Sequence, residues 1–313
     1  MSCDLTVLMA VRNGGPFLRT AIDSILAQTY REFHFLVVDD ESTDDSREIV
    51  RAYTDRRIEL LCLDRNVGQT AALNIGLRRA STPWVARMDA DDYSAPTRFE
   101  EQMHTLKEDP SLSCIGTWAW TFRDDPHICD GTITPQLNYS DIKRELLRTT
   151  PIIHGSIVVN KDAILDVGGY NDRYRYTADI EMYDRFLAKY HAANIPRELL
   201  GIRRHAGQGS RSKIAVDESI EILTLRLSSN NYPPKDAAIV RSTLARSFLY
   251  RACHSARERK WIELWKDIWC GFRASPGSFG FHAFRGLVIS PFPFHWRARL
   301  KRSITRIGPG PDR

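Results

Sequence analysis

The sequence lacks several features that would assign it to other classes of protein. Its six cysteines are scattered, and no two of them form a CxxC pair. This excludes a disulfide framework and a cysteine-based zinc site, and it favours a reducing compartment. No run approaches the roughly 18 to 20 apolar residues that a membrane-spanning helix requires. The first residues lead directly into a strand-like segment without the features of a signal peptide, so we expect a cytosolic location.

Two nucleotide-binding motifs are also missing from the loop after the first predicted strand. This loop, Asn13-Gly14-Gly15-Pro16, contains no GxGxxG pattern, which excludes a dinucleotide-dependent dehydrogenase. It is also short and has no lysine, whereas a sugar nucleotidyltransferase needs a basic glycine-rich loop to hold a triphosphate. A nucleotidyltransferase is kept as an alternative. No recognised nucleic-acid-binding motif is present, and we expect no nucleic-acid partner.

What is present suits a globular protein with an uneven charge distribution. The 313 residues are 42% hydrophobic and 27% charged, which is enough for a large core. Residues 214–313 contain 17 Lys or Arg against 8 Asp or Glu, whereas residues 1–213 contain 27 against 31. A basic tail on an acidic front predicts that the tail meets a polyanion, either membrane headgroups or nucleic acid.

Strand-like and helix-like segments alternate through the first 120 residues. Apolar runs bounded by turn signals predict the strands, and apolar residues spaced three and four apart predict the helices. This order predicts an α/β fold in which helices flank a mainly parallel sheet. Strands are expected at 5–11, 33–38, 58–63, 84–88 and 157–159, and helices after Pro16, after a Ser42 cap, and at 67–80, 141–149, 179–190 and beyond 213.

Polar clusters follow three of these strands. They are Arg12-Asn13, Asp39-Asp40 and Asp89-Ala90-Asp91. Ligands of open parallel sheets bind beyond the carboxyl ends of the strands, so these clusters are expected to converge in one cleft.

Carboxylates in these clusters and at one helix start are candidates for the chemistry. Asp89 and Asp91 can face one hard divalent cation, Mg²⁺ or Mn²⁺, although a solvated acidic turn is the alternative. Asp39 and Asp40 can accept hydrogen bonds from a nucleobase or a ribose, or they can be turn and capping residues. Asp179 at a predicted helix start is either a cap or a general base.

Taken together, these motifs resemble family 2 glycosyltransferases with the GT-A fold over residues 4–205. Each motif alone is weak, but their order and spacing are specific. The motifs are Val11-Arg12-Asn13-Gly14, Val38-Asp39-Asp40-Glu41-Ser42-Thr43-Asp44, Asn66-x-Gly68-x5-Asn74-x-Gly76, Asp89-Ala90-Asp91-Asp92, Pro96-x-Arg98, and Gly168-Gly169-Tyr170 before Ala178-Asp179.

The resemblance implies inverting transfer of a sugar from a nucleotide-diphosphate donor, a UDP-sugar by expectation, to a hydroxyl acceptor. It implies that Asp40 contacts the base, that Asp91 holds a Mn²⁺ or Mg²⁺ ion assisted by Asp89 and His205, and that Asp179 is the catalytic base. His154 is expected to line the acceptor site. The implied nucleotide-sugar site comprises Ala10, Arg12, Asn13, Asp39, Asp40, Gly68, Asn74, Asp89 and Arg204.

Some residues depart from the family pattern or have simpler interpretations. Ala178 stands where the family commonly has Glu, and Arg12 stands where it often has an aromatic residue that stacks on the base. The basic pair Arg203-Arg204, expected near the diphosphate, can also be part of an ordinary surface loop. A lone histidine such as His154 is often structural.

The basic tail carries an aromatic stripe. Trp261, Trp265 and Trp269 recur every four residues beside clustered cations, which suits a helix lying in the headgroup region of a membrane. The alternative is a helical subdomain with solvated charges. We therefore expect a catalytic domain at 1–213 and a helical extension at 214–313, in an enzyme of cell-surface polysaccharide or glycolipid synthesis, peripheral on the inner face of the cell membrane. The competing class is a non-enzymatic protein that binds membranes or nucleic acid through this tail.

Overall fold

The computed structural model describes residues 3–205, 212–229 and 232–280. The part of the predicted basic tail from 281 to 313 lies outside these residues. The chain divides into two compact units, residues 1–215 and 216–313.

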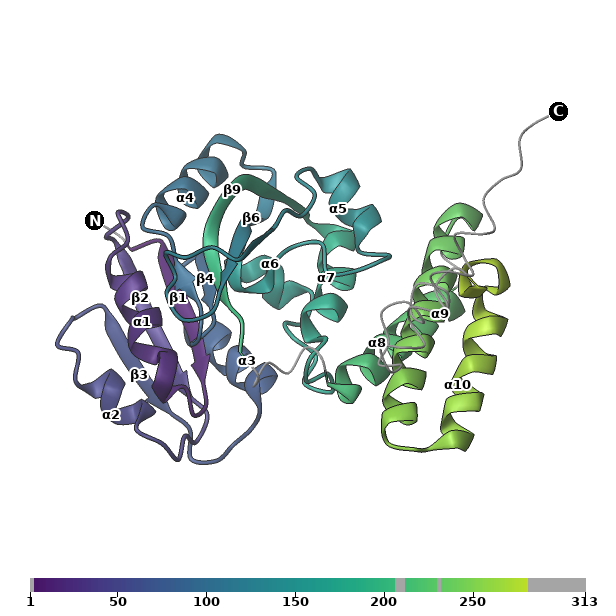
Figure 1. The fold of residues 1–313 in the computed structure, drawn as a ribbon. Helices are drawn as coiled ribbons and strands as arrows, with labels where there is room; N and C mark the ends of the chain where they lie inside the picture. Colours follow the sequence, from purple (N-terminus) through teal and green to yellow (C-terminus); the bar gives the residue numbers. More distant parts are fainter. Residues whose placement is uncertain (1–2, 206–211, 230–231, 281–313) are drawn as a thin grey trace. The chain divides into compact units, whose positions relative to one another are not determined.

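The first unit is built on one mixed sheet flanked by helices (Figure 1). Strands β1 (Leu5–Val11), β2 (Phe33–Asp39), β3 (Ile58–Cys62) and β4 (Trp84–Met88) are parallel, in the order β3-β2-β1-β4. The sheet continues from β4 with β8, β6, β9 and β5, and β7 pairs with β6. The predicted α/β class with a mainly parallel sheet is confirmed.

The apolar strands take central positions because both of their faces are covered. Strand β1 is buried almost throughout, as expected for a parallel strand with helices on both sides. Helix α1 (Gly15–Leu26) buries an apolar face that includes Leu18 and Ile22. Helix α3 (Gln69–Arg79) approaches β1 so closely that a Cβ on Gly76 would lie 2.2 Å from Leu8 Cδ1. Helices α2 (Ser46–Arg51) and α4 (Arg98–Glu108) complete this half.

The second half of the sheet contains strands that the sequence did not predict. The largest are β6 (Leu112–Phe122) and β9 (His191–Arg203), which pair in parallel with three shifts of register. Pro196 and charged residues interrupt the apolar alternation of β9, so its pattern does not indicate a strand. The other elements are β5 (Tyr93–Ser94), β7 (Gly131–Ile133), α5 (Tyr139–Glu145), the 3₁₀ turn η1 (His154–Ser156), β8 (Val158–Asn160), α6 (Lys161–Asp166) and α7 (Ala178–Lys189).

The second unit is helical. Helix α8 (Lys213–Ser228) leads into it, and α9 (Pro234–Arg257) and α10 (Trp261–Ala274) pack as a pair. Arg251 of α9 holds Asp267 of α10 at 2.7 Å and Asp217 of α8 at 3.0 Å. Within the described residues, no helix combines the length and apolar character needed to cross a bilayer.

Candidate active site

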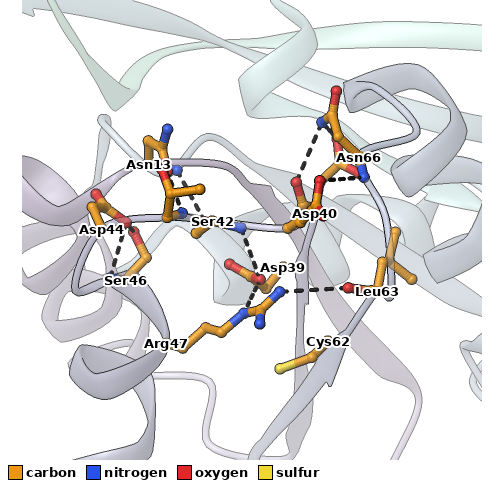
Figure 2. Close-up of polar contacts among 12 residues, drawn as sticks. Asn13, Asp39, Asp40, Ser42, Asp44, Ser46, Arg47, Cys62, Leu63 and Asn66 are labelled. Carbon is orange, nitrogen blue, oxygen red and sulfur yellow. Dashed lines mark hydrogen bonds and ion pairs between the residues drawn. The ribbon is translucent and has the colours of Figure 1, made fainter.

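The loops after β1 and β2 are tied together by side chains that were predicted to bind a nucleotide or cap a helix (Figure 2). Asn13 has a positive φ of 55°, and its side-chain oxygen accepts the backbone N–H of Thr43 at 2.8 Å. Its own N–H donates to the hydroxyl of Ser42 at 3.0 Å. The predicted Ser42 cap is therefore wrong: α2 begins at Ser46, because Ser42 joins the two strand ends instead.

Asp39 at the end of β2 has one carboxylate oxygen held and one left over. Oδ1 accepts the N–H of Ser42 at 3.2 Å and pairs with Arg47 (Figure 2). Oδ2 is buried and has no hydrogen-bond partner among the described residues. A buried acceptor without a donor costs about 1–3 kcal/mol. Asp39 therefore presents the kind of unsatisfied acceptor that a ligand N–H or O–H would satisfy.

Asp40 is hydrogen-bonded to the loop that follows β3. Its carboxylate accepts a hydrogen bond from Asn66 Nδ2 at 2.6 Å (Figure 2). It also accepts the backbone N–H groups of Val67 at 2.7 Å and Gly68 at 2.9 Å. Gly68 has a φ of 87°, a conformation that favours glycine. Asp40 thus shapes the 66–68 loop, and of the two neighbouring acids it is Asp39 that retains a free oxygen.

The carboxyl end of β4 concentrates buried charge. Asp89 pairs with the guanidinium of Arg87, which is 5% exposed in the interior of β4. Burial raises the pKa of Asp89, and Arg87 opposes this effect. Gln69, next to the loop held by Asp40, donates to Asp89 at 3.4 Å. The backbone of Gly155 also approaches, since a Cβ there would lie 3.3 Å from Asp89 Oδ2.

Asp91 and Asp92 differ in their surroundings. Asp91 Oδ2 lies 2.8 Å from His205 Nε2, and about a third of the Asp91 side chain is exposed. Asp92 is buried and accepts the N–H of Arg203 at 3.0 Å. Burial raises the pKa of Asp92 well above its ordinary value, and the charges of Asp89 and Asp91 add to this. Of the three acids, Asp91 is thus the most accessible.

The predicted basic pair consists of two residues with different roles. Arg203 is 4% exposed, and its guanidinium donates to the carbonyls of Asp91 at 3.0 Å and of Arg123 and Asp124 at 2.9 Å. Arg203 therefore holds the loops around the acids from inside the protein. Arg204 is partly exposed, with its Nε 4.0 Å from Asp130 Oδ1.

Asp179 lies at the start of α7, one residue after the N-terminal boundary of the helix. Burial raises its pKa to about 6, and the backbone N–H of Ile180 and the charge of Arg87 counteract part of this effect. The charge of Asp89 adds to the increase. The charges of both Arg87 and Asp89 therefore act on the carboxylate of Asp179.

The turn before α7 is fixed by Asn74, which was predicted to bind the nucleotide sugar. The Asn74 side chain donates to the carbonyl of Tyr170 at 2.7 Å and accepts its N–H at 2.9 Å. The hydroxyl of Tyr170 lies 2.7 Å from His154 Nε2. Burial and the charge of Arg87 hold the pKa of His154 well below its ordinary value, so the ring is neutral at pH 7. Asn74 thus acts on the backbone near Asp179.

The predicted residues fall into two linked groups. Asn13, Asp39, Asp40 and Gly68 surround the ends of β1 and β2, whereas Asp89, Asp91, His205, His154 and Asp179 surround the end of β4. A Cβ on Gly14 would lie 3.5 Å from Ala90 Cβ, so the two groups adjoin. Ala10 is half-buried at the end of β1, and Arg12 is exposed beside it. Arg204 lies 4.0 Å from Asp130, which belongs to neither group.

Arg87 is a residue of the candidate site that the sequence analysis missed. Its charge reaches Asp89, His154 and Asp179. The available signal was an arginine inside the apolar strand Trp84–Met88, because a charge buried in a central strand requires a partner.

The pKa of Asp179 predicts a pH-dependent effect on stability. Because burial raises this pKa from 3.8 to about 6, the folded protein retains the proton to higher pH than the unfolded chain does. Ionised Asp179 therefore destabilises the fold, and this cost develops between pH 4 and 6. Asp179→Asn is expected to increase the free energy of unfolding by about 1–3 kcal/mol at pH 8 and to leave it unchanged near pH 4.

Urea unfolding at both pH values measures this difference, and Asp172→Asn, at an exposed position, is the matched control. If the Asp179→Asn protein were no more stable than the wild type at pH 8, this would contradict the interpretation that burial desolvates the Asp179 carboxylate.

Comparison with protein families identifies the site's relatives. The model of glycosyl transferase family 2 matches residues 6–168. The putative glycosyltransferase EpsE of Bacillus subtilis is 27% identical over 263 residues, covering 82% of this chain and 93% of EpsE. The amylovoran biosynthesis glycosyltransferase AmsE of Erwinia amylovora is 26% identical over 232 residues, covering 72% of this chain and 84% of AmsE.

Solved structures share the fold at low sequence identity. S. aureus TarS 1–349 in complex with UDP-GlcNAc has a TM-score of 0.66 and 15% identity, covering 87% of this chain and 81% of that one. The mannosyltransferase PcManGT from Pyrobaculum calidifontis, in complex with GDP-Man and Mn²⁺, has a TM-score of 0.61 and 19% identity, covering 95% and 86%. The fold of the chain is the GT-A fold of these enzymes.

Proposed function

Since this chain belongs to glycosyl transferase family 2 and is a glycosyltransferase, we propose that it transfers a sugar with inversion from a nucleotide-diphosphate donor to a hydroxyl acceptor. Residues 1–213 form the catalytic domain in this proposal, and residues 214–313 form an extension. The observation that carries the proposal is Asp179, a carboxylate with a pKa of about 6 within electrostatic range of the acidic end of β4.

Asp179 is the general base. A carboxylate with a pKa near 6 is ionised at pH 7 and is a better proton acceptor than an ordinary aspartate. It takes the proton of the acceptor hydroxyl as the hydroxyl oxygen attacks the anomeric carbon. The bond from that carbon to the diphosphate breaks, and its electron pair leaves with the nucleotide diphosphate. A single displacement inverts the configuration at the anomeric carbon.

Asp39 and the 66–68 loop bind the nucleoside. The unpartnered Oδ2 of Asp39 suits an N–H donor of the base, such as the imide of uracil in a UDP-sugar. The TarS structure contains UDP-GlcNAc, which agrees with this choice, whereas PcManGT contains GDP-Man. Asp40 acts through the loop that it holds. Ala10, Arg12 and Asn13 line the same strand ends, and Arg204, which precedes His205 in the chain, is the cation that we assign to the diphosphate.

A divalent cation fits the residues at the end of β4. Within the described part of the chain, no three His, Cys, Asp or Glu side chains form a complete site. Asp91 and His205 lie 2.8 Å apart, and this oxygen–imidazole pair suits Mn²⁺, with Asp89 beside it. Sites of this type commonly complete their coordination with substrate phosphates. A bound cation supplies charge stabilisation for the leaving diphosphate.

The acceptor is a saccharide hydroxyl in cell-surface polysaccharide or glycolipid synthesis, with the enzyme on the cytosolic face of the membrane. The name of AmsE, an amylovoran biosynthesis glycosyltransferase, supports a biosynthetic role. His154 lines the acceptor side, and its ring is oriented by a hydrogen bond to Tyr170.

The test is a transfer assay with radiolabelled UDP- and GDP-sugars, Mn²⁺ and membrane lipid extract as the acceptor source. We expect one donor to release its nucleoside diphosphate and to label the extract. Nuclear magnetic resonance of the product should show an anomeric configuration opposite to that of the donor. Retained configuration, or release of pyrophosphate from a nucleoside triphosphate instead, would contradict the proposal, and the latter would support a nucleotidyltransferase.

A further inference from the structure

Helix α10 presents an apolar face that stays largely exposed in the described part of the chain, although Phe272 at its C-terminal end meets the ring of Phe279, with 6.2 Å between the ring centroids. Five large apolar side chains of this helix are between 46% and 87% exposed. They are nearly half of the eleven exposed large apolar residues that the described part of the chain contains. The five are Trp261, Ile262, Trp265, Trp269 and Phe272, and we call them the α10 aromatic face.

These residues share one side of the helix. With about 100° between successive residues, the five directions fall within an arc of about 100°. The buried residues Asp267 and Gly271 lie on another side of the helix. There α9 packs closely, since a Cβ added to Gly271 would lie 3.3 Å from the carbonyl oxygen of Ala245 in α9. The aromatic face therefore points away from the helix with which α10 packs.

Positive charge borders the aromatic face. Lys266 and Arg273 lie within about 40° of its edge on the same helical projection, and both are exposed. Glu263 lies about 100° away from that edge. The other acidic residue of the helix, Asp267, is buried and neutralised by Arg251. Just before α10, Arg257 and Arg259 are exposed and Lys260 pairs with Glu258 at 2.8 Å, so cations outnumber acids around the face.

We propose that the α10 aromatic face is a docking surface for an anionic lipid bilayer. Tryptophan is enriched at membrane–water interfaces because its ring is apolar while its N–H stays hydrated. Three tryptophans with Ile262 and Phe272 enter the interface, and Lys266 and Arg273 extend along it to meet anionic headgroups. A protein partner would require acidic groups placed opposite these two cations, whereas anionic lipids supply them at every position.

Adsorption of α10 on lipid would bring the catalytic domain to a lipid-linked acceptor, and this purpose rests on the proposed function. The adsorption itself does not require sugar transfer. The two therefore have separate tests.

The experiment measures co-sedimentation of the full chain with vesicles of phosphatidylcholine containing about 30% phosphatidylglycerol, and with pure phosphatidylcholine. We expect the wild type to partition at least ten-fold more strongly onto the anionic vesicles. Trp265→Ala/Trp269→Ala should lose at least ten-fold of this partitioning. Lys266→Glu/Arg273→Glu should lose a similar factor and remove most of the salt dependence.

The matched control is Leu225→Ala/Tyr250→Ala, which removes two apolar side chains of comparable exposure, 55% and 59%, from α8 and α9. It should bind as the wild type does. Asp179→Asn should also bind fully, which separates lipid docking from catalysis. Circular dichroism confirms that each variant is folded.

Three results would overturn the proposal. They are absence of wild-type binding to anionic vesicles, equal loss in the control and tryptophan variants, and a dimer in sedimentation equilibrium that Trp265→Ala/Trp269→Ala dissociates. The dimer would show that a second copy of the chain covers the face.

Discussion

Asp179→Asn is expected to lower the turnover number by about 10²–10⁴-fold and to change the affinity for the donor by less than about two-fold. The amide keeps the size of the side chain but cannot accept the proton of the acceptor hydroxyl. In the proposed site, donor binding depends on Asp39, on the 66–68 loop and on the end of β4, and the substitution removes no side chain from any of them. Steady-state transfer and donor titration on the same preparations measure the two quantities.

The pH profile gives a second check on the role of Asp179. Activity of the wild type should rise as the pH passes about 6, where Asp179 ionises, and level off above pH 7. Asp172→Asn at an exposed position should keep both the rate and the profile. An Asp179→Asn enzyme that retains more than a tenth of wild-type turnover would refute the assignment of the base.

Arg87→Met is expected to destabilise the protein by about 3 kcal/mol, because it leaves the carboxylate of Asp89 in a buried position without its counter-ion. We place the effect at the lower end of the range for a broken buried pair, because a quarter of the Asp89 side chain is exposed. Burial and the charge of Arg87 together lower the pKa of Arg98 to about 9. Removal of Arg87 therefore also removes a charge repulsion that destabilises the charged form of Arg98. Urea unfolding at pH 7 measures the loss.

Two further variants separate charge from packing at this position. Arg87→Met/Asp89→Asn removes both charges and should recover more than half of the lost stability. Arg79→Met breaks an Arg–carboxylate pair of the surface, with Glu59 at 2.9 Å, and should cost less than about 1 kcal/mol. A double variant no more stable than Arg87→Met would mean that packing, and not the ion pair, determines the role of Arg87.

The first half of the fold was predictable because each of its strands is a short apolar run between turn residues. The expected strands at 5–11 and 84–88 coincide with β1 and β4, and the polar clusters do follow the strand ends. The positions of Asp39, Asp89 and Asp91 at one edge of the sheet follow from this topology alone.

Side-chain partners were not predictable, because they come from residues distant in sequence. Asp40 is saturated by a loop 26 to 28 residues away, and Asn74 bonds to Tyr170, 96 residues away. Nothing local in the sequence separates a carboxylate that binds a ligand from one that holds a loop. From the sequence alone, Arg203 is likewise expected to be a surface cation, but at the end of β9 it is buried inside the protein.

The proposed metal-assisted nucleotide-diphosphate site lies at the ends of β2 and β4. Its most direct test is thermal unfolding of the wild type and Asp91→Asn with UDP, GDP and other nucleoside diphosphates, each with and without Mn²⁺. We predict that one nucleotide stabilises the wild type only with Mn²⁺, by about 2.7 kcal/mol at 100 times its dissociation constant, and that Asp91→Asn loses this stabilisation. Equal stabilisation of both proteins without metal, or none by any nucleotide, would contradict this proposal.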